Sequence, residues 1–210
     1  MDAAFLISAF ATLFVVIDPI GITPVFIALS QGASPLQKRA IILRACAIAA
    51  ALLCLFAFLG EGVLDTIGIS MPAFRIAGGL LLFLTAIDML FERRTKRRED
   101  KAEREEDAPD PSVFPMAIPL LAGPGSITTV ILLMGEAQGP GGRAAVLGVM
   151  FAVLGIALVL LLLSGPIERV LGRIGITVVT RLLGMLLAAL SVQFVLDGLT
   201  AYGFGAGIAS

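Results

Sequence analysis

The sequence predicts an all-α integral membrane protein whose six transmembrane segments form two inverted three-helix repeats. Of its 210 residues, 58% are apolar and only 15% are charged, which is far more apolar than a soluble domain. The apolar residues gather in six runs of about 20 residues, the length that crosses a bilayer as a helix. These runs are continuous, whereas strands of a membrane barrel would alternate in polarity. The expected spans are Phe5–Leu29, Ala40–Gly60, Met71–Phe91, Phe114–Met134, Ala144–Ser164 and Val178–Leu199.

A charged segment divides the chain near its middle. Charged residues concentrate in Glu92–Asp110, and the stretch ends in Pro-Asp-Pro. We expect residues 1–92 to form the first repeat, 93–113 a charged cytoplasmic linker and 114–210 the second repeat, together making one membrane domain. The formal net charge of -1 gives no reason to expect a nucleic-acid partner.

Several kinds of chemistry are excluded by residue types. The chain has no histidine, and its cysteines, Cys46 and Cys54, lie in one apolar run. We therefore expect no disulfide, no metal site and no cofactor. The N-terminus lacks the basic residues of a signal peptide, so the first apolar run is expected to remain as a span.

Lysine and arginine in the loops predict the orientation. Twelve of them follow spans one, three or five, whereas only Arg143 lies in a loop on the opposite side. Basic loop residues favour the cytoplasmic side of a membrane. Both termini are therefore expected outside the cytoplasm.

An internal duplication predicts how the spans are arranged. Glu61–Ser70 matches Glu168–Thr177 at six of ten positions, and Arg75–Gly78 matches Arg181–Gly184. Each half has three spans, so the second half must enter the membrane from the opposite face. Inverted repeats of this kind are typical of secondary transporters.

Spans one and four are predicted to break near mid-membrane. In each, prolines and glycines interrupt the apolar run at a matching depth, with Pro19 aligned to Pro124. A proline in a helix removes a hydrogen bond and clashes with the preceding turn, and broken helices in both repeats indicate a transport site. We expect a cavity there, because unwound backbone must be satisfied by protein or trapped water. The candidate substrate-binding residues are Asp18, Pro19, Gly21, Thr23, Gly123, Gly125, Ser126 and Thr128.

Asp18 is the most informative of these residues. A carboxyl group near the bilayer midplane indicates function, either binding a substrate ammonium or carrying a coupling ion. The alternative is a structural one, since aspartate is also a favoured N-cap, and the two roles are compatible. For Glu61, Arg75, Glu168 and Arg181, toward the ends of spans, we expect structural ion pairs, with gating as the alternative.

Two segments resemble the signature segments of MarC-type inner-membrane proteins. They are Asp18-Pro-Ile-Gly-Ile-Thr-Pro-Val-Phe26 and Pro115-Met-Ala-Ile-Pro-Leu-Leu-Ala-Gly-Pro-Gly-Ser-Ile127, and the similarity extends over nearly the whole chain. The resemblance implies a bacterial or archaeal cytoplasmic (inner) membrane and transport of small neutral amino acids, such as glycine or alanine, coupled to a cation. It leaves open whether that cation is a proton or sodium, the direction of transport and homo-oligomerisation.

Amino-acid transport has alternatives from other classes of function. Export of another small solute or drug, or a role as a membrane accessory protein without a substrate, remains an alternative. An intramembrane enzyme is disfavoured, because a nucleophilic Ser126 would need a base and the spans contain no histidine or lysine. Catalysis by paired aspartates is also disfavoured, since Asp18 is central while Asp88 and Asp197 lie near helix ends. The expected partners are therefore a neutral amino acid, a coupling ion and membrane lipid.

Overall fold

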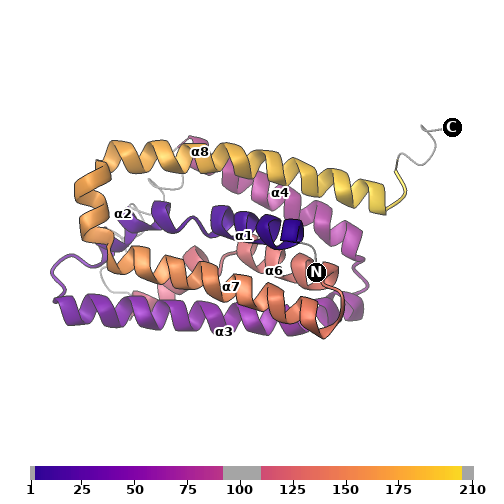
Figure 1. The fold of residues 1–210 in the computed structure, drawn as a ribbon, viewed down its shortest axis with the longest axis horizontal. Helices are drawn as coiled ribbons and strands as arrows, with labels where there is room; N and C mark the ends of the chain where they lie inside the picture. Colours follow the sequence, from indigo (N-terminus) through magenta and orange to yellow (C-terminus); the bar gives the residue numbers. More distant parts are fainter. Residues whose placement is uncertain (1–2, 92–109, 205–210) are drawn as a thin grey trace.

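A computed structural model describes residues 3–91 and 110–204, and every regular element within them is helical (Figure 1). The elements are α1 (Ala3–Ile17), α2 (Pro19–Leu29), α3 (Pro35–Ile67), α4 (Met71–Leu90), η1 (Ser112–Leu121), α6 (Pro124–Glu136), α7 (Gly139–Leu162) and α8 (Ser164–Ala201). The predicted all-helical class is confirmed for this part of the chain. Most of the predicted linker, up to residue 109, lies outside the described residues.

Helix length and composition agree with a membrane protein. Five stretches are long and apolar enough to cross a bilayer, with α1 and α2 counted together. The pair η1 and α6, bent by 53°, forms the sixth if it is one span. Residues Ile7, Phe58 and Leu182 are among many large apolar side chains that are more than half exposed, as expected for a surface that faces lipid.

Helix α3 is longer than its predicted span at both ends. The hydroxyl of Ser34 accepts a hydrogen bond from the Gln37 backbone N–H, and the Gln37 side chain accepts one from the Ser34 backbone, which starts the helix with a capping box. Gly68, in the left-handed region at φ 81°, ends it. Hydropathy marks only the apolar middle of the helix, whereas these caps set its ends.

The start of α8 also differs from the prediction. The helix carries a break at Gly172, whose φ of 60° and ψ of 176° are not helical. The first part of α8 turns across the end of the bundle before the long part runs back along it (Figure 1). Gly172 permits this turn because glycine adopts a positive φ without the steric cost of a side chain.

Helices α4 and α8 pack closely through glycines. A side chain at Gly79 would lie 2.8 Å from the Ser191 carbonyl, and one at Gly184 would lie 3.0 Å from the Met89 Cβ. Gly79 of α4 faces Ser191 of α8, whereas Met89, further along α4, faces the earlier Gly184. The two helices are therefore antiparallel. Glycine lets the backbones approach, as is common between membrane helices.

The two halves of the chain are interlocked. Helix α3 of the first half packs against η1 and α6 of the second, and α7 of the second half packs against α1 and α2 of the first. Figure 1 shows α1, α2 and α6 in the middle, with α3 and α7 on one side and α4 and α8 on the other. The start of α1 and the end of α8 lie at the same end of the bundle. The centre is therefore built from the first segment of each half.

Candidate functional site

The first helix break is centred on Asp18. Its backbone N–H donates to the carbonyl of Phe14 and so closes α1, and its carbonyl accepts from the Ile22 N–H and so opens α2. Asp18 adopts φ 52° and ψ 61°, the only positive φ of a non-glycine residue in the described ranges. Aspartate tolerates this conformation better than most residues. Pro19 follows at the first helical position, where no N–H is needed.

The side chain of Asp18 caps α2. Its Oδ1 accepts a hydrogen bond of 3.0 Å from the Gly21 backbone N–H, while the residue is only 1% exposed. A Cβ at Gly21 would overlap the Asp18 carboxylate, with Cγ 2.7 Å away. The Thr23 hydroxyl donates to the Pro19 carbonyl at 3.3 Å. The capping role proposed for Asp18 is therefore present, and Thr23 is engaged with backbone.

The second break, between η1 and α6, is longer than predicted. Phe114 and Ile118 have extended backbone torsions, φ -129° with ψ 125° and φ -122° with ψ 121°, and each precedes a proline. Both of these bonds to proline are cis. A residue before proline is pushed out of the helical region, so η1 is irregular along its length. The break predicted at Pro119–Thr128 therefore starts earlier in the chain, at Phe114 and Pro115.

Side chains and glycine close this second break. The Ser126 hydroxyl lies 2.9 Å from the Leu121 carbonyl and 3.0 Å from the Gly123 carbonyl, so it satisfies the end of η1. A side chain at Gly123 would collide with the Pro119 carbonyl oxygen. Pro124 begins α6, and Gly123 provides no side-chain cap. The backbone N–H groups of the first turn of α6 therefore lack a capping side chain.

The two breaks meet in the middle of the molecule. A Cβ at Gly125, in the first turn of α6, would lie 3.2 Å from Val16 of α1 and 2.9 Å from Leu82 of α4. Val16 is two residues before Asp18. Thr128 packs its methyl group against Gly78 of α4. The start of α6 therefore lies against the end of α1, close to the Asp18 break.

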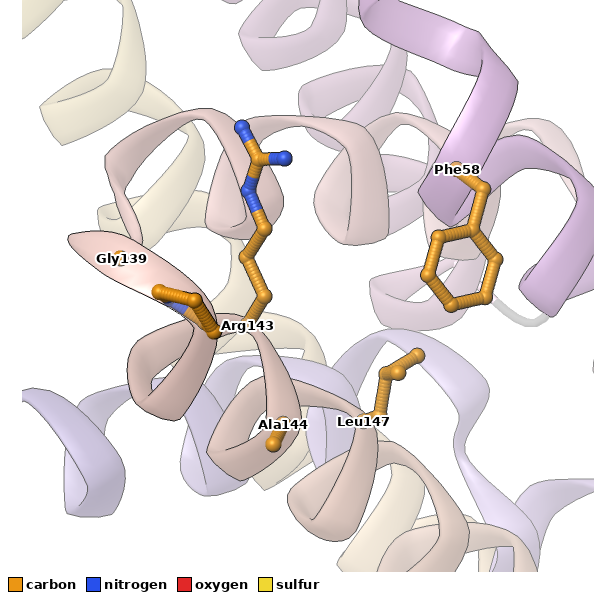
Figure 2. A pocket seen from close by; sticks show the side chains of 6 residues that line it. Phe58, Gly139, Arg143, Ala144 and Leu147 are labelled. Carbon is orange, nitrogen blue, oxygen red and sulfur yellow. The ribbon is translucent and has the colours of Figure 1, made fainter.

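The region around the breaks is closed in this structure. Asp18, Thr23, Ser126 and Thr128 are all at most 4% exposed. A pocket of about 430 Å³ lies elsewhere, between Phe58 of α3 and the start of α7, where Gly139, Arg143 and Leu147 line it (Figure 2). The expected cavity at the breaks is not the pocket seen here. Asp18, Thr23 and Ser126 bond the backbone at the breaks, which reduces the need for trapped water.

Ion pairs occur near the predicted charged positions. Arg75 pairs with Glu136 at the end of α6, and its side chain is only 18% exposed. Glu61 lies 3.7 Å from Arg143, with both side chains about half exposed. The sequence did not single out Glu136 or Arg143 as these partners. The structure gives no ion pair of Glu168 among the described side chains.

Arg181, the fourth of the predicted charged positions, is exposed on α8. The described residues also contain no candidate metal centre. Among them, no group of three or more histidine, cysteine, aspartate or glutamate side chains could hold a metal ion.

One residue of the central region was missed by sequence reasoning. Thr129 of α6 is fully buried, and its hydroxyl has no hydrogen-bond partner in the part of the chain that the structure describes. In the sequence it is only the second of two adjacent threonines, and the choice between Thr128 and Thr129 depends on which neighbour each faces. That information is tertiary.

Comparison with known proteins adds the family. The profile of the MarC family integral membrane proteins matches residues 3–202. The chain belongs to the MarC family. It is 37% identical over 202 residues to a UPF0056 membrane protein of Methanocaldococcus jannaschii, covering 95% of this chain and 98% of that protein. It is 40% identical over 196 residues to a UPF0056 membrane protein of Aquifex aeolicus, covering 92% and 91%.

A third MarC relative bears on location. The chain is 32% identical over 194 residues to the UPF0056 inner membrane protein YhgN of Escherichia coli, covering 92% of this chain and 95% of that protein. No solved structure matches this chain. The MarC chain described here is therefore an integral membrane protein, and the names of these relatives state no substrate.

Proposed function

We propose that this MarC protein is a secondary transporter of small neutral amino acids, coupled to a cation, in the cytoplasmic membrane. The observation that carries the proposal is that the start of α6 lies close to the helix break at the buried Asp18. Gly125 at the start of α6 lies against Val16, directly before the Asp18 break, and Asp18 is 1% exposed. An ionisable group buried between broken helices is the usual form of a transport site.

The chemistry at the breaks suits a zwitterion. The first N–H groups of α6 lack a capping side chain, and the positive end of the helix dipole favours a carboxylate there. Asp18 supplies the negative charge that an ammonium group needs. Gly21, Gly123 and Gly125 keep side chains away from both breaks, so a small substrate can approach the backbone. Ser126 and Thr23 are engaged with carbonyl groups in this closed state and would change partner on opening.

The packing supports an inverted arrangement of the halves. If α1, α2, α3 and α4 correspond to η1, α6, α7 and α8, contacts between the halves recur with the halves exchanged. The packing of α1 on α7 corresponds to that of η1 on α3, the packing of α2 on α7 to that of α6 on α3, and the packing of α2 on α8 to that of α6 on α4. Helices α4 and α8, which correspond to each other in the two halves, pack directly against each other. Two equivalent packings of this kind allow a site to open alternately to either side. In this proposal the Arg75–Glu136 ion pair joins α4 to the outer end of α6. The proposed protein is a transporter and not an enzyme.

Uptake into proteoliposomes tests the proposal. Purified protein should accumulate labelled glycine or alanine when a proton or sodium gradient is imposed, and large or charged amino acids should compete poorly. Dissipating the effective gradient should abolish accumulation while leaving exchange. Absence of both uptake and exchange for every neutral amino acid, with well-folded protein in the vesicles, would refute amino-acid transport.

A further inference from the structure

The hydroxyl of Thr129 lacks the backbone hydrogen bond that four other helical threonines of the described residues make. A threonine in an apolar helix usually donates its hydroxyl to the carbonyl four residues earlier. Thr23, Thr66, Thr85 and Thr200 all do so, at distances between 2.7 and 3.3 Å. Thr129 is 0% exposed, yet its Oγ1 bonds neither the Gly125 carbonyl nor any other described group. A buried hydroxyl without a partner destabilises a fold.

The helix geometry gives the direction of this side chain. Thr128 packs on Gly78 of α4, and Gly125 lies against both Leu82 of α4 and Val16 of α1. Successive residues of a helix are about 100° apart, so Thr129 is turned from α4 toward α1. It also lies one turn after Gly125 on the same face. Thr129 is therefore within one helical turn of the place where the two breaks meet.

The surroundings make a purely structural role a poor explanation. Helix α6 is buried nearly all round, since Val130, Leu132 and Leu133 of this helix are all buried, so a valine at position 129 would fit an apolar environment without loss. Rules of polar satisfaction are broken mainly at functional sites, where stability is given up for activity. A hydroxyl held ready beside the start of α6 can donate to a carboxylate bound there.

We propose that Thr129 is a substrate-contacting residue whose hydroxyl donates a hydrogen bond to the carboxylate of the transported amino acid. This inference rests on the proposed transport function and adds a residue to its site. The substrate carboxylate occupies the uncapped N–H groups of the first turn of α6, and Thr129 holds it from the side facing α1. In the closed structure the hydroxyl has no partner because the substrate provides it.

Three variants test the proposal: Thr129→Val, which keeps the shape and removes the hydroxyl, Thr129→Ser, which keeps the hydroxyl, and Thr180→Val. Thr180 is a control for the loss of a buried hydroxyl, because its Oγ1 is also buried without a partner among the described groups, whereas it belongs to α8 and not to the helices that form the two breaks. The readouts are the melting temperature without amino acid and the dissociation constant for alanine.

Thr129→Val should melt several degrees higher than the wild type and bind alanine about tenfold more weakly. Thr129→Ser should stay within about threefold of wild-type affinity, and Thr180→Val should raise the melting temperature without weakening binding. Wild-type affinity in Thr129→Val, or an equal loss in Thr180→Val, would overturn the role of Thr129 alone. If the wild type itself binds and transports no neutral amino acid, the proposed function fails and the substrate role of Thr129 fails with it.

Discussion

Replacing Asp18 with asparagine separates the two roles that the structure allows for this residue. Asp18 caps α2 through a 3.0 Å bond from the Gly21 N–H and holds a left-handed conformation. Asparagine is as good an N-cap as aspartate and tolerates the same torsions, so Asp18→Asn should change the unfolding free energy by only about 0.5 kcal/mol. Alanine loses the cap, worth about 1 kcal/mol, and is strained by about 1–2 kcal/mol, so Asp18→Ala should lose about 2–3 kcal/mol.

The effect of Asp18→Asn on transport then tests the functional role of the carboxylate. If Asp18 binds the ammonium or the coupling ion, Asp18→Asn loses a charge-assisted interaction of about 1.5–3 kcal/mol, which weakens binding roughly 10- to 150-fold. Gradient-driven accumulation should then be lost in a variant that still melts like the wild type. Melting in detergent and uptake into proteoliposomes, with pH varied inside and outside, give both quantities. A well-folded Asp18→Asn protein with wild-type accumulation and pH dependence would leave Asp18 as a cap only.

Three further predictions concern packing, topology and pH. Gly21→Ala should melt as if about 1–2 kcal/mol were lost, because its Cβ displaces the Asp18 carboxylate, whereas Gly62→Ala, with nothing within 4 Å, should be neutral or slightly stabilising. Reporter fusions after Gly62 and at the C-terminus should be extracytoplasmic and one near Lys101 cytoplasmic; a cytoplasmic C-terminus would remove the inverted-repeat argument. The Ser112 hydroxyl and N–H, and then Arg44, lower the pKa of Asp110. The stability from Asp110 is therefore present above the unfolded pKa of about 4 and is lost as pH falls below it, so melting curves of Asp110→Asn and wild type should converge in acid.

Prolines and glycines made the breaks predictable from sequence. Pro19 and Pro124 each begin a helix in the structure, as expected of residues that cannot continue one from before. Local chemistry also explains the extended residue before each proline of η1. These effects of proline and glycine depend only on neighbouring residues, so they can be predicted from a single sequence.

Partners distant in the chain were beyond the same reasoning. The pairing of Arg75 with Glu136 joins positions 61 residues apart, and the direction of Thr129 depends on where α1 and α4 pass α6. The sequence also implied a cavity, whereas the freed backbone groups are bonded by Asp18, Thr23 and Ser126. Whether a polar side chain bonds its own backbone or faces a cavity depends on packing, which composition does not determine.

The interlocking of the halves has a consequence for synthesis. Helices α1 and α2 are covered mainly by α6, α7 and α8, which leave the ribosome later. At roughly 5–20 residues per second, the hundred or so residues between α2 and the end of α6 take about 5–20 s to make. During that interval Thr12 and Asp18, at most 3% exposed in the finished protein, are without the helices that cover them. Membrane insertion of the first half is thus expected to precede its packing against the second half. Until the second half is synthesised, the translocon, a chaperone or lipid must cover the surfaces that α6, α7 and α8 later bury.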